Sequence, residues 1–173
     1  KPLPPLVLPR EQAVLFDRDE RGAWRVESDP ASSASLTVQA DGPPVTMRLE
    51  YGLAGGEANN QFAALVADLP GGAASYDRLA LRIRSQKPAR LSVQTRAAVN
   101  ESRDDRWSRS IYVEDRWQDI TFALDEMRPI GQTRTASPPS ASIHSLVFAL
   151  EMTNTAPGAT GVIEFERVML QGP

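Results

Sequence analysis

The chain has no cysteine and only one histidine among its 173 residues. The lack of cysteine excludes disulfides, thiol nucleophiles, iron–sulfur clusters and thiolate zinc sites, and it leaves the redox compartment open. A single histidine, His144, cannot build a histidine-rich metal centre, and no GxSxG or P-loop motif accompanies it. Because His144 shares a strand face with large apolar residues in the segment 142–152, we interpret it as structural or solvent-edge rather than catalytic.

Long apolar runs are also missing, and lysine is scarce. No run approaches the roughly 18 residues that span a bilayer, so we expect no membrane insertion of this segment. The net charge of −3 predicts no nucleic-acid partner. Yet the segment 78–116 holds nine arginines and one lysine against five acids, a local excess of +5. A GC-rich genome explains so many arginines, and so does a surface that grips carboxylate, sulfate or phosphate groups.

Proline is concentrated at the start, with four in the first ten residues. Such a segment is typical of an extended, polyproline-like tether. We therefore divide the chain into a tether, 1–12, and one domain, 13–173. Since the chain opens without an initiator methionine, we interpret it as a trimmed or excised piece. We expect an extracytoplasmic location, periplasmic or secreted, in which the tether leads to a membrane anchor or another module.

The domain itself shows short strands and almost no helical periodicity. We count about eleven strands separated by turn signals, the spacing of an antiparallel β-sandwich. In the segment 78–85, leucine and isoleucine alternate with alanine and arginine, as expected when one face of a strand is buried. One helical turn is predicted over 125–127, and a disordered polar loop over 131–142. The fold class predicted is all-β, a sandwich of the jelly-roll type.

Two stretches carry a family likeness. The first combines YDRLALRIRS (76–85) with DRWQDITFALDEM (115–127), and the second is LVFALEMTNTAPGATGVIEFERVML (146–170). They resemble galactose-binding-like jelly rolls, especially family 11 carbohydrate-binding modules and the complex I intermediate-associated 30 kDa proteins. The resemblance implies a non-catalytic module that binds ligand on a concave sheet face or on end loops, with a structural calcium near the termini. One departure is Glu166, where the family commonly has aspartate.

The three tryptophans could stack a sugar or fill the core. Trp107 has the parity of Ile111 and Val113, which predicts a core position, although Arg109 interrupts this set and suggests an edge or a bulge. We expect Trp117 to cover the end of the core and Trp24 to lie within it.

A glycan site is predicted on a polar sheet face. If the strands around 79–83, 91–95 and 110–113 lie in one sheet, their outward side chains gather with those of the segment 146–151. The predicted ligand-binding residues are Arg82, Arg84, Gln94, Arg96, Tyr112 and Glu151. Guanidinium and amide groups beside an aromatic ring suit a neutral or acidic glycan. The alternative is a solvated face in which arginine stems cover apolar surface.

A calcium site follows from the family resemblance. The matching acidic residues are Asp17 and Glu166, together with Asp19. Carboxylates with backbone carbonyls suit this hard cation, but ordinary charge pairing with Arg18, Arg21 or Arg167 is the alternative.

The leading functional prediction is a non-catalytic carbohydrate-binding module of an exported bacterial protein, with a polysaccharide or glycan as its partner. The alternative is a structural or protein-interaction module without a sugar site. Because no recognised catalytic motif is present, we predict that the chain is not an enzyme.

Overall fold

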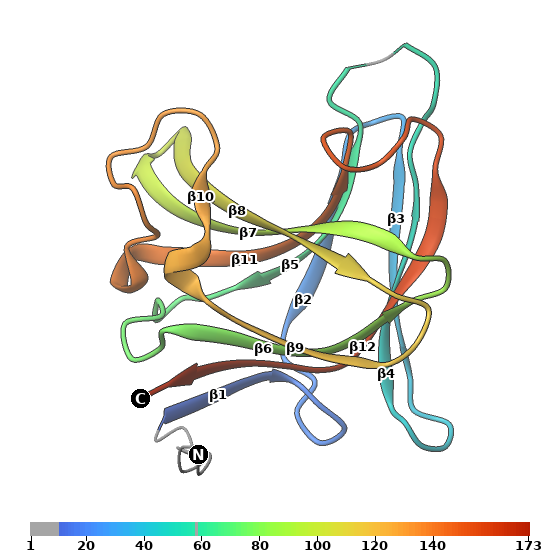
Figure 1. The fold of residues 1–173 in the computed structure, drawn as a ribbon, viewed down its shortest axis with the longest axis horizontal. Helices are drawn as coiled ribbons and strands as arrows, with labels where there is room; N and C mark the ends of the chain where they lie inside the picture. The colour runs from blue at the N-terminus through green and yellow to red at the C-terminus, as the bar shows by residue number, and fades with distance from the viewer. Residues whose placement is uncertain (1–10, 58) are drawn as a thin grey trace, which may run out of the picture.

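A computed structural model describes residues 11–57 and 59–173, so the first ten residues of the expected tether lie outside the described residues. The chain forms two antiparallel sheets packed face to face (Figure 1). The jelly-roll β-sandwich predicted from the sequence is confirmed. No helix among the described residues is long and apolar enough to cross a membrane.

Sheet A has six strands in the order β3-β4-β12-β6-β9, with β1 paired beside the end of β12. Its strands are β1 (Glu11–Phe16), β3 (Ser33–Gln39), β4 (Thr46–Gly52), β6 (Arg78–Ser85), β9 (Gln118–Ala123) and β12 (Thr160–Gly172). The longest strand, β12, therefore pairs with three others. The first described strand, β1, begins two residues before the predicted boundary of the domain, and the division into tether and domain stays a prediction.

Sheet B also has six strands, in the order β10-β8-β7-β11-β5-β2. They are β2 (Trp24–Ser28), β5 (Phe62–Asp68), β7 (Ala89–Asn100), β8 (Arg103–Val113), β10 (Arg128–Pro129) and β11 (Ile143–Glu151). Two short 3-10 turns complete the described elements, η1 (Leu124–Glu126) and η2 (Ser140–Ser142). The first of these agrees with the helical turn predicted from the sequence.

The core lies between the sheets and follows the alternation of the sequence. In β6, Leu79, Leu81 and Ile83 are at most 1 % exposed. The rings of Phe148 from β11 and Phe165 from β12 meet across the two sheets, with centroids 4.8 Å apart. Each sheet thus keeps one face for the core and one for solvent, which leaves two outer faces for function.

The loop 131–142, which the sequence predicts to be disordered, is held by specific contacts. The buried Asp105 carboxylate accepts hydrogen bonds from the Arg134 N–H at 3.0 Å and from Arg134 Nε at 3.2 Å. Trp107 Nε1 donates to the Thr135 carbonyl at 3.2 Å. The backbone N–H of Arg134 holds the pKa of Asp105 below its ordinary value. Polar composition marked this segment as a loop, but its anchors come from a distant strand.

Replacing Asp105 with asparagine should release this loop. An uncharged amide accepts weaker hydrogen bonds and turns donors toward those of Arg134. We expect tryptic cleavage after Arg134 to accelerate about tenfold, because proteolysis follows local opening. Rates measured by mass spectrometry should be compared with those of Asp125→Asn, an exposed carboxylate on η1. Equal rates in both variants would show that Asp105 does not hold the loop.

Candidate functional site

The outer face of sheet B carries a cleft with an apolar floor. Ala64 of β5 and Val147 and Ala149 of β11 line its floor; together with the neighbouring Val66 they point away from the main core, yet each is at most 3 % exposed. These side chains are small and lie on central strands, so their longer neighbours enclose them; Phe62 packs against them. The cleft has a volume of about 680 Å³, within the range that accommodates small ligands. We call it the sheet B cleft.

Strand register brings polar side chains to this cleft from three strands. Gln94 of β7 lies opposite Ser108 of β8, and Arg96 lies opposite Arg106. Glu151, at the end of β11, completes the set. The cleft therefore combines an apolar floor with amide, hydroxyl, guanidinium and carboxylate groups along its sides.

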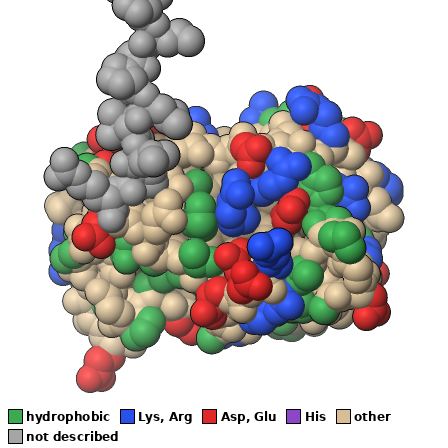
Figure 2. All heavy atoms as spheres, turned by 90° about the horizontal axis from the view of Figure 1, so that it is seen from below, with side chains coloured by type: hydrophobic (Ala, Val, Ile, Leu, Met, Phe, Trp, Pro, Cys, Tyr) green, Lys and Arg blue, Asp and Glu red, His purple; other side chains and the backbone are tan. Residues whose placement is uncertain are grey.

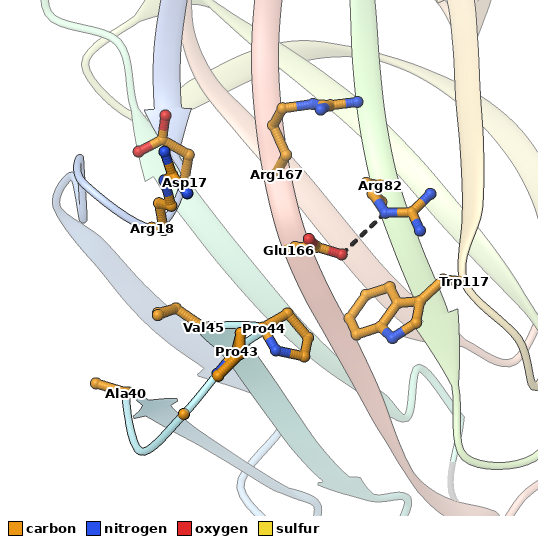
Figure 3. A pocket seen from close by; sticks show the side chains of 11 residues that line it. Asp17, Arg18, Ala40, Pro43, Pro44, Val45, Arg82, Trp117, Glu166 and Arg167 are labelled. Atoms are coloured by element: carbon orange, nitrogen blue, oxygen red, sulfur yellow. Dashed lines mark hydrogen bonds and ion pairs between the residues drawn. The ribbon is translucent and has the colours of Figure 1, made fainter.

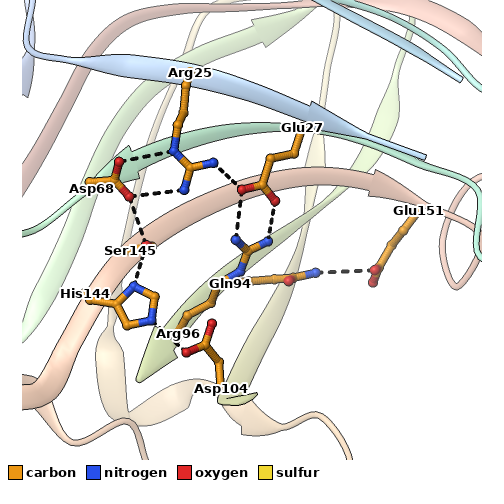
Figure 4. Close-up of polar contacts among 9 residues, drawn as sticks. All are labelled: Arg25, Glu27, Asp68, Gln94, Arg96, Asp104, His144, Ser145 and Glu151. Atoms are coloured by element: carbon orange, nitrogen blue, oxygen red, sulfur yellow. Dashed lines mark hydrogen bonds and ion pairs between the residues drawn. The ribbon is translucent and has the colours of Figure 1, made fainter. Parts of the chain in front are cut away.

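Gln94 is held rigidly in the cleft. It is 3 % exposed, and its Nε2 donates to Ser92 Oγ at 3.1 Å and to Glu151 Oε2 at 3.3 Å. A buried amide with partners on two strands loses little freedom when a ligand binds. It also orients the Glu151 carboxylate, as Figure 4 shows.

Arg96 belongs to an ion-paired network that extends across the sheet (Figure 4). Its two terminal nitrogens donate to the two carboxylate oxygens of Glu27 at 3.0 and 3.1 Å. Arg25 bonds Glu27 as well, and it donates to both oxygens of Asp68 at 3.1 and 3.2 Å. Because fork-to-fork pairs restrict both side chains, the network presents Arg96 to the cleft in one orientation.

Charge pairing lowers the pKa of both carboxyl groups in this network. The hydrogen bond from Arg96 is the largest cause for Glu27 and outweighs the opposing effect of burial. For Asp68, the hydrogen bond from Arg25 is the largest cause. Both groups are therefore ionised at neutral pH, and Arg96 meets a ligand with its charge already balanced.

His144 closes the far end of the network. Its Nε2 lies 2.9 Å from Asp104 Oδ1, its Nδ1 lies 2.7 Å from Ser145 Oγ, and the Ser145 hydroxyl donates to Asp68. Ser145 is 1 % exposed. Each ring nitrogen of His144 thus has a side-chain partner, and its interpretation as structural or solvent-edge stays a prediction.

The structure brings together three of the six predicted ligand-binding residues, Gln94, Arg96 and Glu151. Tyr112 lies on the same outer face and is 51 % exposed, but it stands beyond the cleft, where the Arg90 guanidinium lies 5.8 Å from its ring centroid. Its expected role as the stacking ring beside Gln94 and Arg96 therefore has no support in this placement.

Arg82 and Arg84 do not share a face with the other predicted residues, so the expected grouping was wrong. They lie on β6 in sheet A and pair with Glu166 and Glu164, on the opposite side of the molecule. The chain crosses from one sheet to the other in the three residues between β6 and β7. Alternation reports whether a side chain points inward or outward, but it does not report which sheet the strand joins.

The predicted set missed several residues of the site, among them two polar residues of β8 and the carboxylate that pairs with Arg96. Arg106 and Ser108 line the cleft and have the same parity as Tyr112, so the alternation of β8 could have revealed them. Arg106 is exposed, and no described residue forms an ion pair with its guanidinium. Glu27 had no local signal, because its contact with Arg96 depends on the order of strands in the sheet.

The predicted calcium residues are only partly gathered. Asp17 and Glu166 line one groove, but Arg82 donates to Glu166 at 2.9 Å, and the Asp17 carboxylate accepts backbone N–H groups of its own turn. The Asp19 N–H is one of those donors. Within residues 11–57 and 59–173, no group of three histidine, aspartate or glutamate side chains is placed to hold a metal ion. The calcium site stays a prediction.

The tryptophans divide between the core and the surface. Trp107 is 1 % exposed, as its parity predicts, and Trp24 packs against the core beside Phe148, with ring centroids 6.1 Å apart. Arg109 interrupts the inward set of β8 without a bulge, and its guanidinium lies 4.7 Å from the Phe122 ring centroid. Trp117 differs from the expectation: it lies against Arg84 on the outer face of sheet A.

Solved structures with this fold include carbohydrate-binding modules. A family 11 module from Clostridium thermocellum, in complex with a β-1,3-1,4-mixed-linked tetrasaccharide, has a TM-score of 0.75 at 18 % identity and covers 93 % of this chain and 95 % of its own. The family 11 module of the cellulosomal cellulase Lic26A-Cel5E, from the same organism, has a TM-score of 0.77 at 17 % identity and covers 94 % of this chain and 95 % of its own.

A second module family gives the same result. The family 30 module of the cellulosomal cellulase Cel9D-Cel44B of Clostridium thermocellum has a TM-score of 0.63 at 14 % identity, covering 94 % of this chain and 98 % of its own. No protein-family model matches the sequence, and no curated protein matches it. These likenesses establish a galactose-binding-like jelly roll, so the resemblance to family 11 modules is confirmed at the level of the fold. The resemblance to the complex I 30 kDa proteins stays a prediction.

Proposed function

We propose that the chain is a non-catalytic carbohydrate-binding module of an exported bacterial protein and that it binds a glycan in the sheet B cleft. The observation that carries the proposal is the rigid set of Gln94, Arg96 and Glu151 over an apolar floor. Sugars present apolar C–H faces and many hydroxyl groups, and this combination of floor and sides is complementary to both. The similar structures are binding modules, which supports the same role here.

The charge balance of the cleft favours a neutral glycan. Glu27 neutralises Arg96, so the charges that remain along the sides are those of Arg106 and Glu151, one of each sign. An acidic glycan would meet the Glu151 carboxylate as well as Arg106, and like charges repel in a partly desolvated cleft. Hydroxyl groups can donate to Glu151 and accept from Arg106 at no such cost.

A binding screen with matched variants tests this function. Neutral and acidic polysaccharides should be titrated into the protein by calorimetry. We expect binding of a neutral glycan to weaken about tenfold in Gln94→Leu and in Arg106→Ala, since each removes about one net hydrogen bond. Arg103→Ala is the control, because it removes an exposed arginine of the same strand that does not line the cleft.

The outcomes separate the alternatives. If the folded protein binds none of the polysaccharides, this result would contradict the proposal and favour the protein-interaction alternative. Repeating the titration with calcium and with EDTA tests the predicted metal: if calcium at Asp17 and Glu166 supports the module, EDTA lowers its melting temperature.

A further inference from the structure

Trp117 is the tryptophan that neither the core nor the sheet B cleft uses. It lies on the outer face of sheet A, and the guanidinium carbon of Arg84 is 4.7 Å from its ring centroid. The indole is partly buried and lines a groove that does not include Arg84 among its lining residues. The cation therefore covers one side of the ring and braces it, while another part of the ring surface faces the groove.

The groove runs between two turns and two strands (Figure 3). Asp17 and Arg18 of the turn after β1 lie at one side, and the Pro43–Pro44 turn between β3 and β4 lies at another. Arg82 and Trp117 lie across the groove from the turns. In the view of Figure 3, the Glu166 carboxylate of β12 lies between the turns and these two side chains. We call this the sheet A groove, and it lies on the opposite side of the sandwich from the cleft.

A β-bulge in β12 provides the polar floor of the groove. The register with β6 shifts between Phe165, which pairs with Ile83, and Arg167, which pairs with Arg82. Glu166 is the extra residue, and both Glu166 and Arg167 line the groove. An extra residue of this kind turns two consecutive side chains to one face, where a regular strand would place only one.

The charged groups on the strand side of the groove, Arg82, Glu166 and Arg167, are already paired. Arg82 donates to Glu166 at 2.9 Å and to Asp119 at 3.0 Å, and Arg167 donates to the other oxygen of Asp119 at 3.0 Å. Figure 2, which views this side of the molecule, shows positive and negative side chains interleaved. Because neither sign is in excess, the groove offers little attraction to an anion or a cation, but it offers donors and acceptors in adjacent pairs.

We infer that the sheet A groove is a second site for a neutral oligosaccharide, with one sugar ring stacked on Trp117 and its hydroxyls bonded to Arg82 and Glu166. The indole supplies a flat apolar surface for the sugar ring, and the ion pair supplies a donor beside an acceptor. The two sites lie on opposite faces of the sandwich. One module can therefore bridge two glycan chains, and avidity follows when both sites are engaged.

Fluorescence of the indole tests the site directly. A β-1,3-1,4-mixed-linked tetrasaccharide, cellotetraose, xylotetraose and a charged control, trigalacturonic acid, should be titrated to millimolar concentration. We expect a neutral probe to shift or quench the tryptophan emission, and Trp117→Phe to abolish that response. Trp24 and Trp107 should stay silent, since both donate their indole N–H to backbone carbonyls and pack against the core. Arg82→Met should weaken the neutral probe about tenfold.

Controls make each outcome decisive. Tyr112→Ala removes an exposed aromatic ring from the other sheet and should leave the response intact. An unchanged response in Trp117→Phe would overturn the proposal. A response to trigalacturonic acid or to a proline-rich peptide, but not to the neutral sugars, would also overturn it. The absence of a response to every probe would overturn it as well. The emission change reports Trp117, whereas Gln94→Leu alters the sheet B cleft, so failure of one site is distinguishable from failure of the other.

Discussion

Phe148→Ala should lower the free energy of unfolding by about 4 kcal/mol, the largest effect we expect of any single substitution. Phe148 is fully buried, and its ring meets Phe165 across the two sheets at 4.8 Å and Trp24 at 6.1 Å. The substitution removes packing from both sheets at once, and rigid neighbours on two layers cannot collapse into the space. Because a domain is stable by only about 5–15 kcal/mol, such a loss approaches unfolding.

Urea denaturation followed by circular dichroism measures this loss. Tyr112→Ala is the control, since Tyr112 is 51 % exposed on an outer face. Its removal should change stability by about 0.5 kcal/mol or less. If Phe148→Ala proved as stable as Tyr112→Ala, the contact between the two sheets would not be a determinant of stability.

Arg96→Met should cost about 2 kcal/mol, mainly because it leaves Glu27 without its principal partner. The side chains of Arg96 and Glu27 are 17 % and 27 % exposed, so water compensates only in part. Adding Glu27→Gln removes the stranded charge, and the double variant should recover part of the loss. A double-mutant cycle at about pH 7, measured by urea denaturation, gives the coupling energy of the pair. A coupling energy near zero would contradict a role for the pair in stability.

Lowering the pH should remove the extra stability that glutamate has over glutamine at position 27. The pKa of Glu27 in the folded protein lies below its ordinary value of 4.5, so above that value both the folded and unfolded states hold the carboxylate and the stabilisation is complete. As pH falls, the unfolded state takes the proton first, and the stabilisation is gone below the folded pKa. The difference in the free energy of unfolding between wild type and Glu27→Gln should therefore become smaller as the pH falls from about 7 to about 3.

Arg96 is a poor probe of ligand contact, because its side chain also pairs with Glu27. A variant that loses glycan binding at this position has also released Glu27 and, through it, Arg25. Arg106 separates the two effects better, because it is exposed and has no ion-pair partner among the described residues.

Local periodicity explains why much of the fold could be predicted. Leu79, Leu81, Ile83 and Trp107 are all nearly fully buried, as their positions in alternating strands indicate. The period of two depends only on neighbours along the chain, so a single strand displays it. The same logic identified Gln94 and Arg96 as outward-facing.

Partnership between strands explains what could not be predicted. Glu27 lies 69 positions from Arg96 in the sequence, and no local pattern joins them. Arg82 and Arg84 were assigned to the wrong face because alternation carries no information on sheet membership. Trp117 was expected to cover the end of the core because it immediately precedes a strand. It instead packs against the Arg84 side chain on the outer surface, and no sequence pattern links these two residues.

The position of β12 in the chain has a consequence for how the protein is made. This strand pairs with β1, β4 and β6, yet it is the last of the twelve described strands to be translated. All six strands of sheet B are complete by Glu151, whereas sheet A lacks its central strand until residues 160–172 emerge. We therefore expect the nascent chain to carry an uncovered apolar sheet face until β12 has been translated, so that the sandwich closes only after every earlier strand has been made.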